Sequence, residues 1–390
     1  MVKSMENKSR ISYGVVLLCM IAILLFGSKL LSNDAKVVDS LSVQGMNQDK
    51  TEEPVDKLEP LEPYMIVDQD VYEADLEKAN EQRIKEELKK EETKEEVTPK
   101  VEEEKETLKE EEEESNSLEL AIEAVNIKNP KLSVDAKAAI LMNADTKEIL
   151  YNKSGLDKIQ PASTAKLLTA IVAVELSDEK EEFVVGKEIN LIASDSSRAY
   201  LRDGQVLSLS QILDALLLPS GNDAAYTIAA NIGRKIAADD SLKPKDAVAI
   251  FVEKMNETAK EIGVVCSVFK GPDGYDAIGQ YTTAYDMSLI GAAALEHEII
   301  RETVKKPKAR DLLLSGDDVT WTNSNKLVKQ GSGYYYSHAI GLKTGTSGKA
   351  GRCLISAATK DGATYVSVVM DSSIEGRWQD SVDLLRYAIE

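Results

Sequence analysis

Histidine and cysteine are scarce in this chain of 390 residues. It holds two histidines, His297 and His338, and three cysteines, Cys19, Cys266 and Cys353. None of them stands in a CxxC or HxxxH spacing, and zinc, iron–sulfur and haem-attachment sites need more ligands than these. We therefore expect no metal and no cofactor. The spacing of Cys266 and Cys353 does not decide whether these two pair or stay as thiols.

Positive charge is also in deficit. Lys and Arg number 47 against 67 Asp and Glu, so the formal net charge is -20 and the sequence pI is about 4.8. Because phosphate binding needs clustered Lys and Arg, we expect no nucleic-acid partner. The acidic surplus is local, since residues 51–114 hold 26 Asp and Glu against 10 Lys and Arg. The rest of the chain has the charge balance of an ordinary globular domain.

An uncharged apolar run covers residues 11–27, ISYGVVLLCMIAILLFG. Extended to residue 31, it reaches the roughly 20 residues that cross a bilayer. Three basic residues precede it: Lys3, Lys8 and Arg10. This pattern predicts a cytoplasmic segment at 1–10, a single-pass membrane anchor at 11–31, and a catalytic domain on the extracytoplasmic side of the cell membrane. A cleaved signal peptide is the alternative, but no A-x-A-like cleavage site follows the run.

Residues 32–117 are poor in aromatic and other apolar residues and contain a Glu/Lys-rich tract. Such a composition cannot bury a core, so we interpret this segment as an acidic, low-complexity stalk. A plain spacer is the favoured role. A partner-binding tail and a coiled-coil dimer are alternatives, although sustained heptads are missing.

Residues 118–390 have the composition of one folded domain. Alternating apolar residues around polar turns predict a β-hairpin over 138–152 and another over 351–371. Apolar residues at helical spacing predict helices between and after them: 162–176, 209–218, 224–236, 247–262 and 378–389. Strands at both ends with helices in the middle predict an α+β fold, an antiparallel sheet covered by helices on both faces.

Ser163 and Lys166 stand at the start of the first of these helices, in PASTAK. Residues three apart share one helix face, so the amine lies beside the hydroxyl and can take its proton if its pKa is lowered. A capping serine with a surface lysine is the structural alternative for an isolated S-x-x-K.

Two further clusters of polar residues follow along the chain. Ser220 and Asn222 occur in the turn LPSGND behind a run of leucines, where a helix–loop–helix connection is the alternative. Lys343 lies in IGLKTGT (residues 340–346), which we interpret as an edge strand whose N–H groups can pair with an extended peptide. The order and local context of the three motifs together are far more specific than any one of them.

S-x-x-K, S-x-N and K-T-G together resemble the penicillin-recognising serine acyl-enzymes. Within that group the chain is most similar to the D-alanyl-D-alanine carboxypeptidases among low-molecular-weight penicillin-binding proteins, as in PASTAKLLTA, LLLPSGNDAA, GPDGYD and GLKTGTSGKAGRCL. The resemblance spans about residues 136–386. It implies a DD-peptidase/β-lactamase-like fold for residues 118–390 and a role in peptidoglycan synthesis, cell-wall maturation and cell shape.

The resemblance also implies roles for individual residues. Ser163 is the implied nucleophile, Lys166 its general base, and Ser220 the relay of the proton to the leaving amine. Substrate binding is assigned to Asn222, Lys343, Thr344, Thr346 and, on a looser match, Arg377. The N–H groups of Ser163 and Thr346 are the implied oxyanion donors. The substrate is a peptidoglycan stem peptide ending in D-Ala-D-Ala, and β-lactam antibiotics are expected as covalent inhibitors.

Two other functions compete with this interpretation. A β-lactamase shares the three motifs, but Ser-Gly-Asn in place of Ser-Asp-Asn argues against a class A enzyme. A non-catalytic wall-binding sensor predicts loss of Ser163, Lys166 or Lys343, and all three are present.

Overall fold

The computed structural model describes residue 119 and residues 132–178 and 180–390. These belong to the second of two units into which the chain divides, residues 94–390. The segments 1–10, 11–31 and 32–117, with Cys19, lie outside the described residues. Within the described part, no helix combines the length and the apolar character that a membrane span requires.

One antiparallel sheet of six strands dominates the described part of the chain. Its strands are β1 (Ala138–Asn143), β2 (Ile149–Lys153), β7 (Ala339–Gly341), β8 (Thr344–Ser347), β9 (Gly351–Lys360) and β10 (Ala363–Ser372). The spatial order is β2-β1-β10-β9-β7, and β8 also pairs with β9. The first and last strands of the domain are thus central neighbours, because β1 pairs with β10. Two small hairpins complete the strands: β3 (Glu182–Val184) with β4 (Val206–Ser208), and β5 (Lys308–Leu312) with β6 (Asp318–Thr322).

Both predicted hairpins of the main sheet are confirmed. In the β1–β2 turn, the side chain of Asn143 accepts the N–H groups of Asp145 and Thr146, which fixes the polar turn. The β9–β10 turn contains Asp361 and Gly362, both with positive φ, as a tight two-residue hairpin connection requires.

The five predicted helices are also present, with shifted ends. They are α4 (Lys166–Leu176), preceded by the 3-10 turn η1 (Ala162–Ala165), and α5 (Leu209–Leu217), α6 (Asn222–Ala237), α7 (Pro244–Ile262) and α10 (Gly376–Ile389). Two more helices, α8 (Ala284–Glu296) and α9 (Glu298–Lys305), and a short 3-10 turn η2 (Lys187–Asn190) were not predicted.

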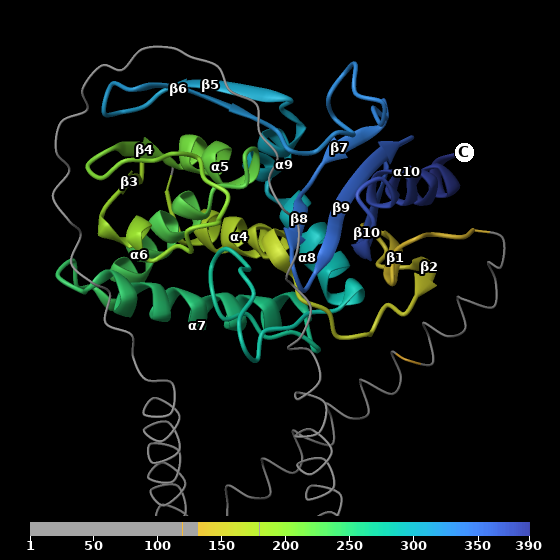
Figure 1. Ribbon diagram of the computed structural model, residues 1–390, viewed down its shortest axis with the longest axis horizontal. Coiled ribbons are helices and arrows are strands. Elements are labelled where there is room, and N and C mark those ends of the chain that lie inside the picture. The colour runs from red at the N-terminus through yellow and green to blue at the C-terminus, as the bar shows by residue number, and fades with distance from the viewer. Residues whose placement is uncertain (1–118, 120–131, 179) are drawn as a thin grey trace, which may run out of the picture. The chain divides into compact units, whose positions relative to one another are not determined.

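The two faces of the sheet pack against different helices, as Figure 1 shows. Along β1, Ile140 points into the large core that includes α8, whereas Leu141 points into a smaller core that contains Trp378 of α10. This alternation is the period of a strand that is buried on both faces. The α+β prediction, with helices on both faces of an antiparallel sheet, is confirmed. The large core continues into the helices α4 to α7, which lie beside the sheet.

Cys266 and Cys353 are both free thiols in this fold. Cys353 is fully buried in β9, and Cys266 is half-buried in the loop after α7.

Candidate active site

Ser163 and Lys166 lie where the turn η1 passes into α4. The Lys166 Nζ donates to the Ser163 Oγ at 2.9 Å, so the predicted shared face is present. The same amine donates to the Asn222 Oδ1 at 2.7 Å and to the carbonyl of Asp273 at 3.0 Å. Lys166 is fully buried, and all three of its partners are neutral oxygens. A buried amine held in this way is suited to exchange a proton with the serine.

Burial lowers the pKa of Lys166 from its ordinary value to about 8. The carboxylates of Asp273 and Asp223 act in the opposite direction and raise it. Because the resulting value lies close to neutral pH, an appreciable fraction of the amine is unprotonated there. Lys166 can thus act as a base without a histidine.

The turn with Ser220 and Asn222 brings the second motif to the same amine. Gly221 is the N-cap of α6, and Asn222 is the first residue of that helix. The Asn222 Nδ2 donates to the Asp273 Oδ2 at 2.5 Å, which leaves its Oδ1 facing Lys166. The Ser220 Oγ is buried and has no hydrogen-bond partner within the described part of the chain. A buried hydroxyl without a partner has capacity for a substrate group.

The run 340–346 is not the single strand that the sequence predicts. It breaks at Gly341 and Leu342, which have φ of 109° and 83°, and continues as β8. A Cβ at Gly341 would lie 2.3 Å from the carbonyl oxygen of Val304 in α9, so close packing against that helix bends the strand. The edge position is confirmed, because β8 pairs with β9 alone.

Lys343 lies at this break and is fully buried. Its Nζ donates to the carbonyl of Thr344 at 2.9 Å. Burial, and then the positive charges of Lys166 and Arg377, hold its pKa well below the ordinary range. The Thr344 hydroxyl lies 2.7 Å from the Ser324 hydroxyl. Two buried amines, Lys166 and Lys343, therefore lie in the site, and burial disfavours the charged form of each.

Arg377 reaches the sheet edge from α10. Its Nη1 donates to the Thr346 Oγ1 at 3.1 Å and to the Gly345 carbonyl at 3.3 Å, and its guanidinium lies 4.4 Å from the ring centre of Trp378. Burial, and then the charge of Arg352, lower its pKa. Its Nε is buried without a partner in the described residues. Arg377, which was assigned to substrate binding on a looser match, therefore places its guanidinium beside Thr346.

A cavity of about 140 Å³ opens at Ser163. Of the predicted site residues, Ser163, Asn222 and Thr346 line it. The other five predicted residues are not part of its lining: Lys166, Ser220, Lys343, Thr344 and Arg377. Lys166 is linked to the lining through Ser163 and Asn222, and Arg377 through Thr346.

The segment 271–276, GPDGYD, closes one side of this cavity. Gly274, with φ of 73°, approaches η1 so closely that a Cβ would lie 1.9 Å from the Ala162 carbonyl oxygen. The Tyr275 hydroxyl donates to Asp195 at 2.9 Å, and the Asp276 carboxylate accepts from the Ser347 hydroxyl at 2.7 Å. The segment thus bridges the loop around residue 195 and the strand β8.

Sequence reasoning missed Asp273 as a residue of the site. It is 2% exposed, and it contacts both Asn222 and Lys166. The segment GPDGYD is part of the family resemblance, but the sequence alone suggests no role for the carboxylate of Asp273. An acidic residue between a proline and a glycine is a usable signal, because such a turn fixes a side chain in place.

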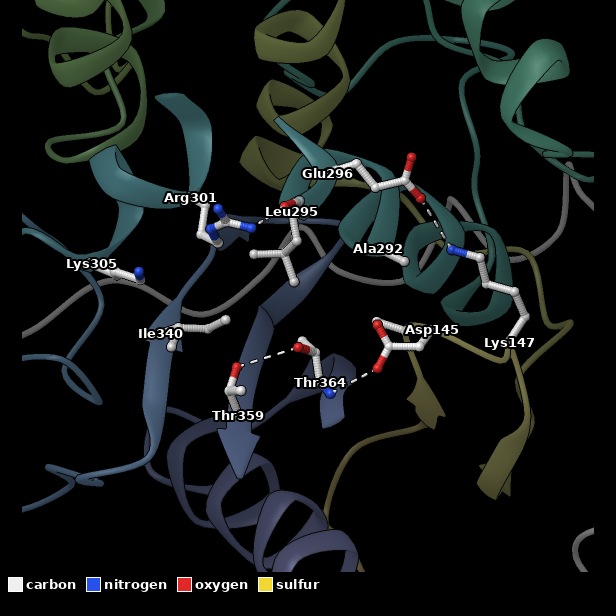
Figure 2. A pocket seen from close by; sticks show the side chains of 11 residues that line it. Asp145, Lys147, Ala292, Leu295, Glu296, Arg301, Lys305, Ile340, Thr359 and Thr364 are labelled. Carbon is white, nitrogen blue, oxygen red and sulfur yellow. Dashed lines mark hydrogen bonds and ion pairs between the residues drawn. The ribbon is translucent and has the colours of Figure 1, made fainter. Parts of the chain in front are cut away.

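A larger hollow of about 670 Å³ lies at the other end of β9, away from β8 (Figure 2). None of the predicted site residues lines it. Most of its charged groups are already engaged, since Lys147 pairs with Glu296, Lys305 with Glu302, and Asp145 accepts the N–H of Thr364. Its geometry offers no nucleophile beside a base.

The sequence and fold of this chain are similar to those of known proteins. The model of the D-alanyl-D-alanine carboxypeptidase family matches residues 124–374. The chain belongs to this family. Its members include the D-alanyl-D-alanine carboxypeptidase DacF of Bacillus subtilis, 30% identical over 248 residues, which are 62% of this chain and 59% of the relative. A D-alanyl-D-alanine carboxypeptidase of Streptomyces is 31% identical over 66% of this chain and 88% of its own length.

Solved structures of D-alanyl-D-alanine peptidases agree with the family assignment. The crystal structure of a Streptomyces DD-transpeptidase superposes with a TM-score of 0.60 at 30% identity, covering 66% of this chain and 98% of that chain. The D-alanyl-D-alanine carboxypeptidase DacD from Francisella tularensis gives a TM-score of 0.57 at 25% identity, covering 66% of this chain and 71% of its own. The chain spans about three fifths of the length of DacF.

Proposed function

We propose that the chain is a serine-type D-Ala-D-Ala carboxypeptidase that removes the terminal D-alanine from peptidoglycan stem peptides. The observation that carries this proposal is the 2.9 Å hydrogen bond between Lys166 Nζ and Ser163 Oγ, in a buried site where the pKa of the amine is about 8. A serine hydroxyl needs an adjacent base to become a nucleophile, and this amine is the group within reach.

In the acylation step, Lys166 takes the proton of Ser163, and Oγ bonds to the carbonyl carbon between the two D-alanines. The oxyanion that forms accepts hydrogen bonds from the backbone N–H groups of Ser163 and Thr346. The C–N bond then breaks, and Ser220 passes the proton from Lys166 to the leaving amine. An ester between Ser163 and the shortened peptide remains.

In the deacylation step, water attacks this ester and gives its proton to the unprotonated amine of Lys166. The serine regains a proton as the ester bond breaks, so the enzyme returns to its starting state. In both steps Lys166 first accepts a proton from the attacking oxygen and then gives a proton up as the bond to the leaving group breaks.

Binding of the substrate involves two sides of the cavity. Asn222 holds the amide on the acyl side through its carboxamide. On the other side, Lys343, Thr344, Thr346 and Arg377 surround the terminal carboxylate. A carboxylate bound there would offset the burial that lowers the pKa of both Lys343 and Arg377, and so would favour their charged forms. The buried, unpartnered Nε of Arg377 supports this assignment.

The proposal includes the setting of the enzyme. Residues 11–31 would anchor it in the cell membrane, the stalk 32–117 would hold the domain 118–390 away from the bilayer, and catalysis would take place on the extracytoplasmic side. β-Lactams, which also present an acyl group and a carboxylate, would acylate Ser163. Nucleic acids are not expected as partners.

Release of D-alanine from an N-acetylated peptide ending in D-Ala-D-Ala tests the proposal. We expect release by the wild-type chain and none by Ser163→Ala, with circular dichroism showing that the variant is folded. A folded wild-type chain that releases no D-alanine would contradict it.

Labelling with penicillin separates the two competing functions. A long-lived adduct on Ser163 is expected for the peptidase. Rapid turnover of the adduct would indicate a β-lactamase, and absence of any adduct would indicate a non-catalytic sensor.

A further inference from the structure

Left-handed backbone marks the active site of this protein. Nine non-glycine residues of the described part have a φ between 45° and 83°. Three of them, Ala162, Ser220 and Leu342, directly precede Ser163, Gly221 and Lys343. Five others lie in hairpin turns, at a helix C-cap or at strand ends: Lys147, Ser154, Ala238, Asp361 and Asp371. Tyr200, with φ of 62°, is the remaining one, and neither a turn nor a cap accounts for it.

The residues on both sides of Tyr200 are fixed by the buried Asp223. Its Oδ1 accepts the N–H of Ala199 at 2.8 Å, and its Oδ2 accepts the N–H of Leu201 at 3.0 Å. The Ala199 carbonyl accepts the indole N–H of Trp321 at 3.0 Å. Ala199 and Leu201 are therefore buried, whereas the side chain between them is directed outwards and Tyr200 is 82% exposed.

A bulky residue in the left-handed region costs conformational free energy, so other contacts must maintain it. Here those contacts hold an aromatic ring at the surface, in contact with water. An aromatic side chain displayed on a rigid backbone binds a ligand at low entropic cost. The conformation of Tyr200 is thus suited to recognition.

Tyr200 lines a groove of about 580 Å³ between the loop 198–202 and the strand β6. Arg198 and Arg202 line the same groove. Arg202 pairs with Asp317, but Arg198 is exposed and has no acidic partner within residues 132–178 and 180–390. The carboxylate of Asp223 also lines the groove, where it accepts the N–H groups of Ala199 and Leu201. The groove therefore has an aromatic surface and one guanidinium, that of Arg198, that no carboxylate of the described residues contacts.

The residues that line the groove directly follow residues of the catalytic cavity in sequence. Ser196 and Ser197 line the cavity, and Arg198 lines the groove. A cavity of about 140 Å³ holds only the reacting end of a peptide. The leaving group of a carboxypeptidase is a single residue. Any contact beyond the cavity is therefore made with the acyl side of the substrate.

We propose that Tyr200 and Arg198 form a recognition site for the acyl-side segment of the peptide substrate. The ring of Tyr200 packs on an apolar part of this segment, and the guanidinium of Arg198 pairs with a carboxylate that the segment carries. This inference rests on the proposed carboxypeptidase function and adds a preference for long, acidic substrates.

Three peptides ending in D-Ala-D-Ala test it: an N-acetylated tripeptide, a hexapeptide with a carboxylate side chain on its acyl side, and the same hexapeptide with that carboxylate replaced by an amide. We expect Tyr200→Ala to lower kcat/KM for the acidic hexapeptide about tenfold, through KM, and to leave the tripeptide within twofold. Arg198→Ala should lower kcat/KM for the acidic hexapeptide and leave that for the other two peptides unchanged. Tyr387→Ala, which removes an exposed tyrosine from α10, is the control and should change nothing.

Tyr200→Asn provides a second variant, because asparagine tolerates a left-handed backbone and the loop keeps its conformation. It should reproduce the loss seen with Tyr200→Ala. In addition, binding of the acidic hexapeptide to Ser163→Ala, measured by calorimetry, should weaken about tenfold when Tyr200 is also replaced.

The outcomes separate the two claims. If the wild-type chain releases D-alanine from none of the peptides, the proposed function is wrong. If it releases D-alanine and the two Tyr200 variants lose equally on short and long peptides, or lose nothing, the recognition site is wrong. Unchanged calorimetric binding after replacement of Tyr200 would also overturn it.

Discussion

Lys166 shows how burial alone prepares a base. Its amine contacts three neutral oxygens, and its pKa falls to about 8 because the charges of Asp273 and Asp223 only partly offset its removal from water. Neither His297 nor His338 lines the cavity at Ser163, so the proposed base is this amine.

The pKa of Lys166 predicts the pH dependence of acylation. The unprotonated amine is the active form, so the rate should rise with pH through a midpoint near 8 and level off above it. The second-order rate constant for penicillin labelling, measured between pH 6 and 9.5, checks this. A rate that is flat over this range would show that Lys166 is not the base.

Asp273 holds Asn222 and, through it, the amine. Replacing Asp273 by Asn removes a negative charge that raises the pKa of Lys166, so the midpoint of the labelling profile should move to lower pH. The plateau rate should also fall, about tenfold, because the carboxamide of Asn222 loses a strong acceptor. Asp240→Asn, at an exposed position after α6, is the matched control. A lower plateau rate with an unchanged midpoint would show that Asp273 acts through packing and does not influence the pKa of Lys166.

At the scale of elements, the site depends on short segments that interrupt regular structure. The turn η1, the first residue of α6, the end of β8 and the segment 271–276 meet around one cavity. Each is held by a close backbone approach or a buried side chain. The catalytic groups are thus fixed before substrate arrives.

Gly274 is the tightest of these approaches. Alanine there would place a Cβ 1.9 Å from the Ala162 carbonyl oxygen, and φ of 73° is unfavourable for any side chain. Gly274→Ala should lower the free energy of unfolding by about 2 kcal/mol and slow penicillin labelling, because η1 and the segment 271–276 must separate. Chemical denaturation and labelling kinetics measure the two effects. Gly316→Ala, at a glycine with a similar φ and open space around it, separates strain from contact.

Much of this element arrangement was predictable, and the reasons differ from element to element. The hairpins 138–152 and 351–371 follow from alternation around polar turns, and the helix at Ser163 from its proline and apolar spacing. The helix α8 was missed because it is buried nearly all round, so its apolar residues have no strong period. The break at Leu342 was missed because it depends on contact between Gly341 and α9, which are distant in sequence.

The site divides in the same way. S-x-x-K is a local pattern, so the contact between Ser163 and Lys166 follows from helical spacing. The contacts of Asp273 and of Tyr200 arise from tertiary packing, which no spacing records.

At the scale of the whole domain, an ion pair between the buried Asp214 and the partly exposed Lys306 joins α5 to the C-terminal end of α9. Asp214 of α5 is 1% exposed, and both of its oxygens accept from Lys306 at 2.8 Å. Burial still raises the pKa of Asp214 to about 6, although Lys306 lowers it. The carboxylate is therefore costly to keep in place without its partner.

Lys306→Met should destabilise the domain by about 2 kcal/mol at pH 8, since the half-exposed lysine is partly screened by solvent. Because the folded pKa of Asp214 is raised above its unfolded value, the fold favours the protonated acid. Loss of Lys306 removes a charge that lowers the pKa of Asp214, so this pKa lies above about 6 in the variant. The deficit should therefore shrink as pH falls from 8 towards 6 and stay constant below, where Asp214 is protonated with or without Lys306. Urea unfolding at pH 5 and pH 8 tests this, and Lys308→Met, which replaces an exposed lysine, is the control. A deficit that is equal at the two pH values would contradict it.

The left-handed backbone of Ala162, Ser220 and Leu342 bears on how this domain could be made more stable. Glycine at 162, 220 or 342 would relieve backbone strain, so a screen that rewards heat resistance alone would be drawn to these positions. Replacement at 162 or 342 would also loosen the chain beside Ser163 or Lys343, and replacement at 220 would remove the hydroxyl proposed to relay the proton. Selection for thermal stability would therefore favour glycine at these three positions, whereas selection for catalytic rate would disfavour it.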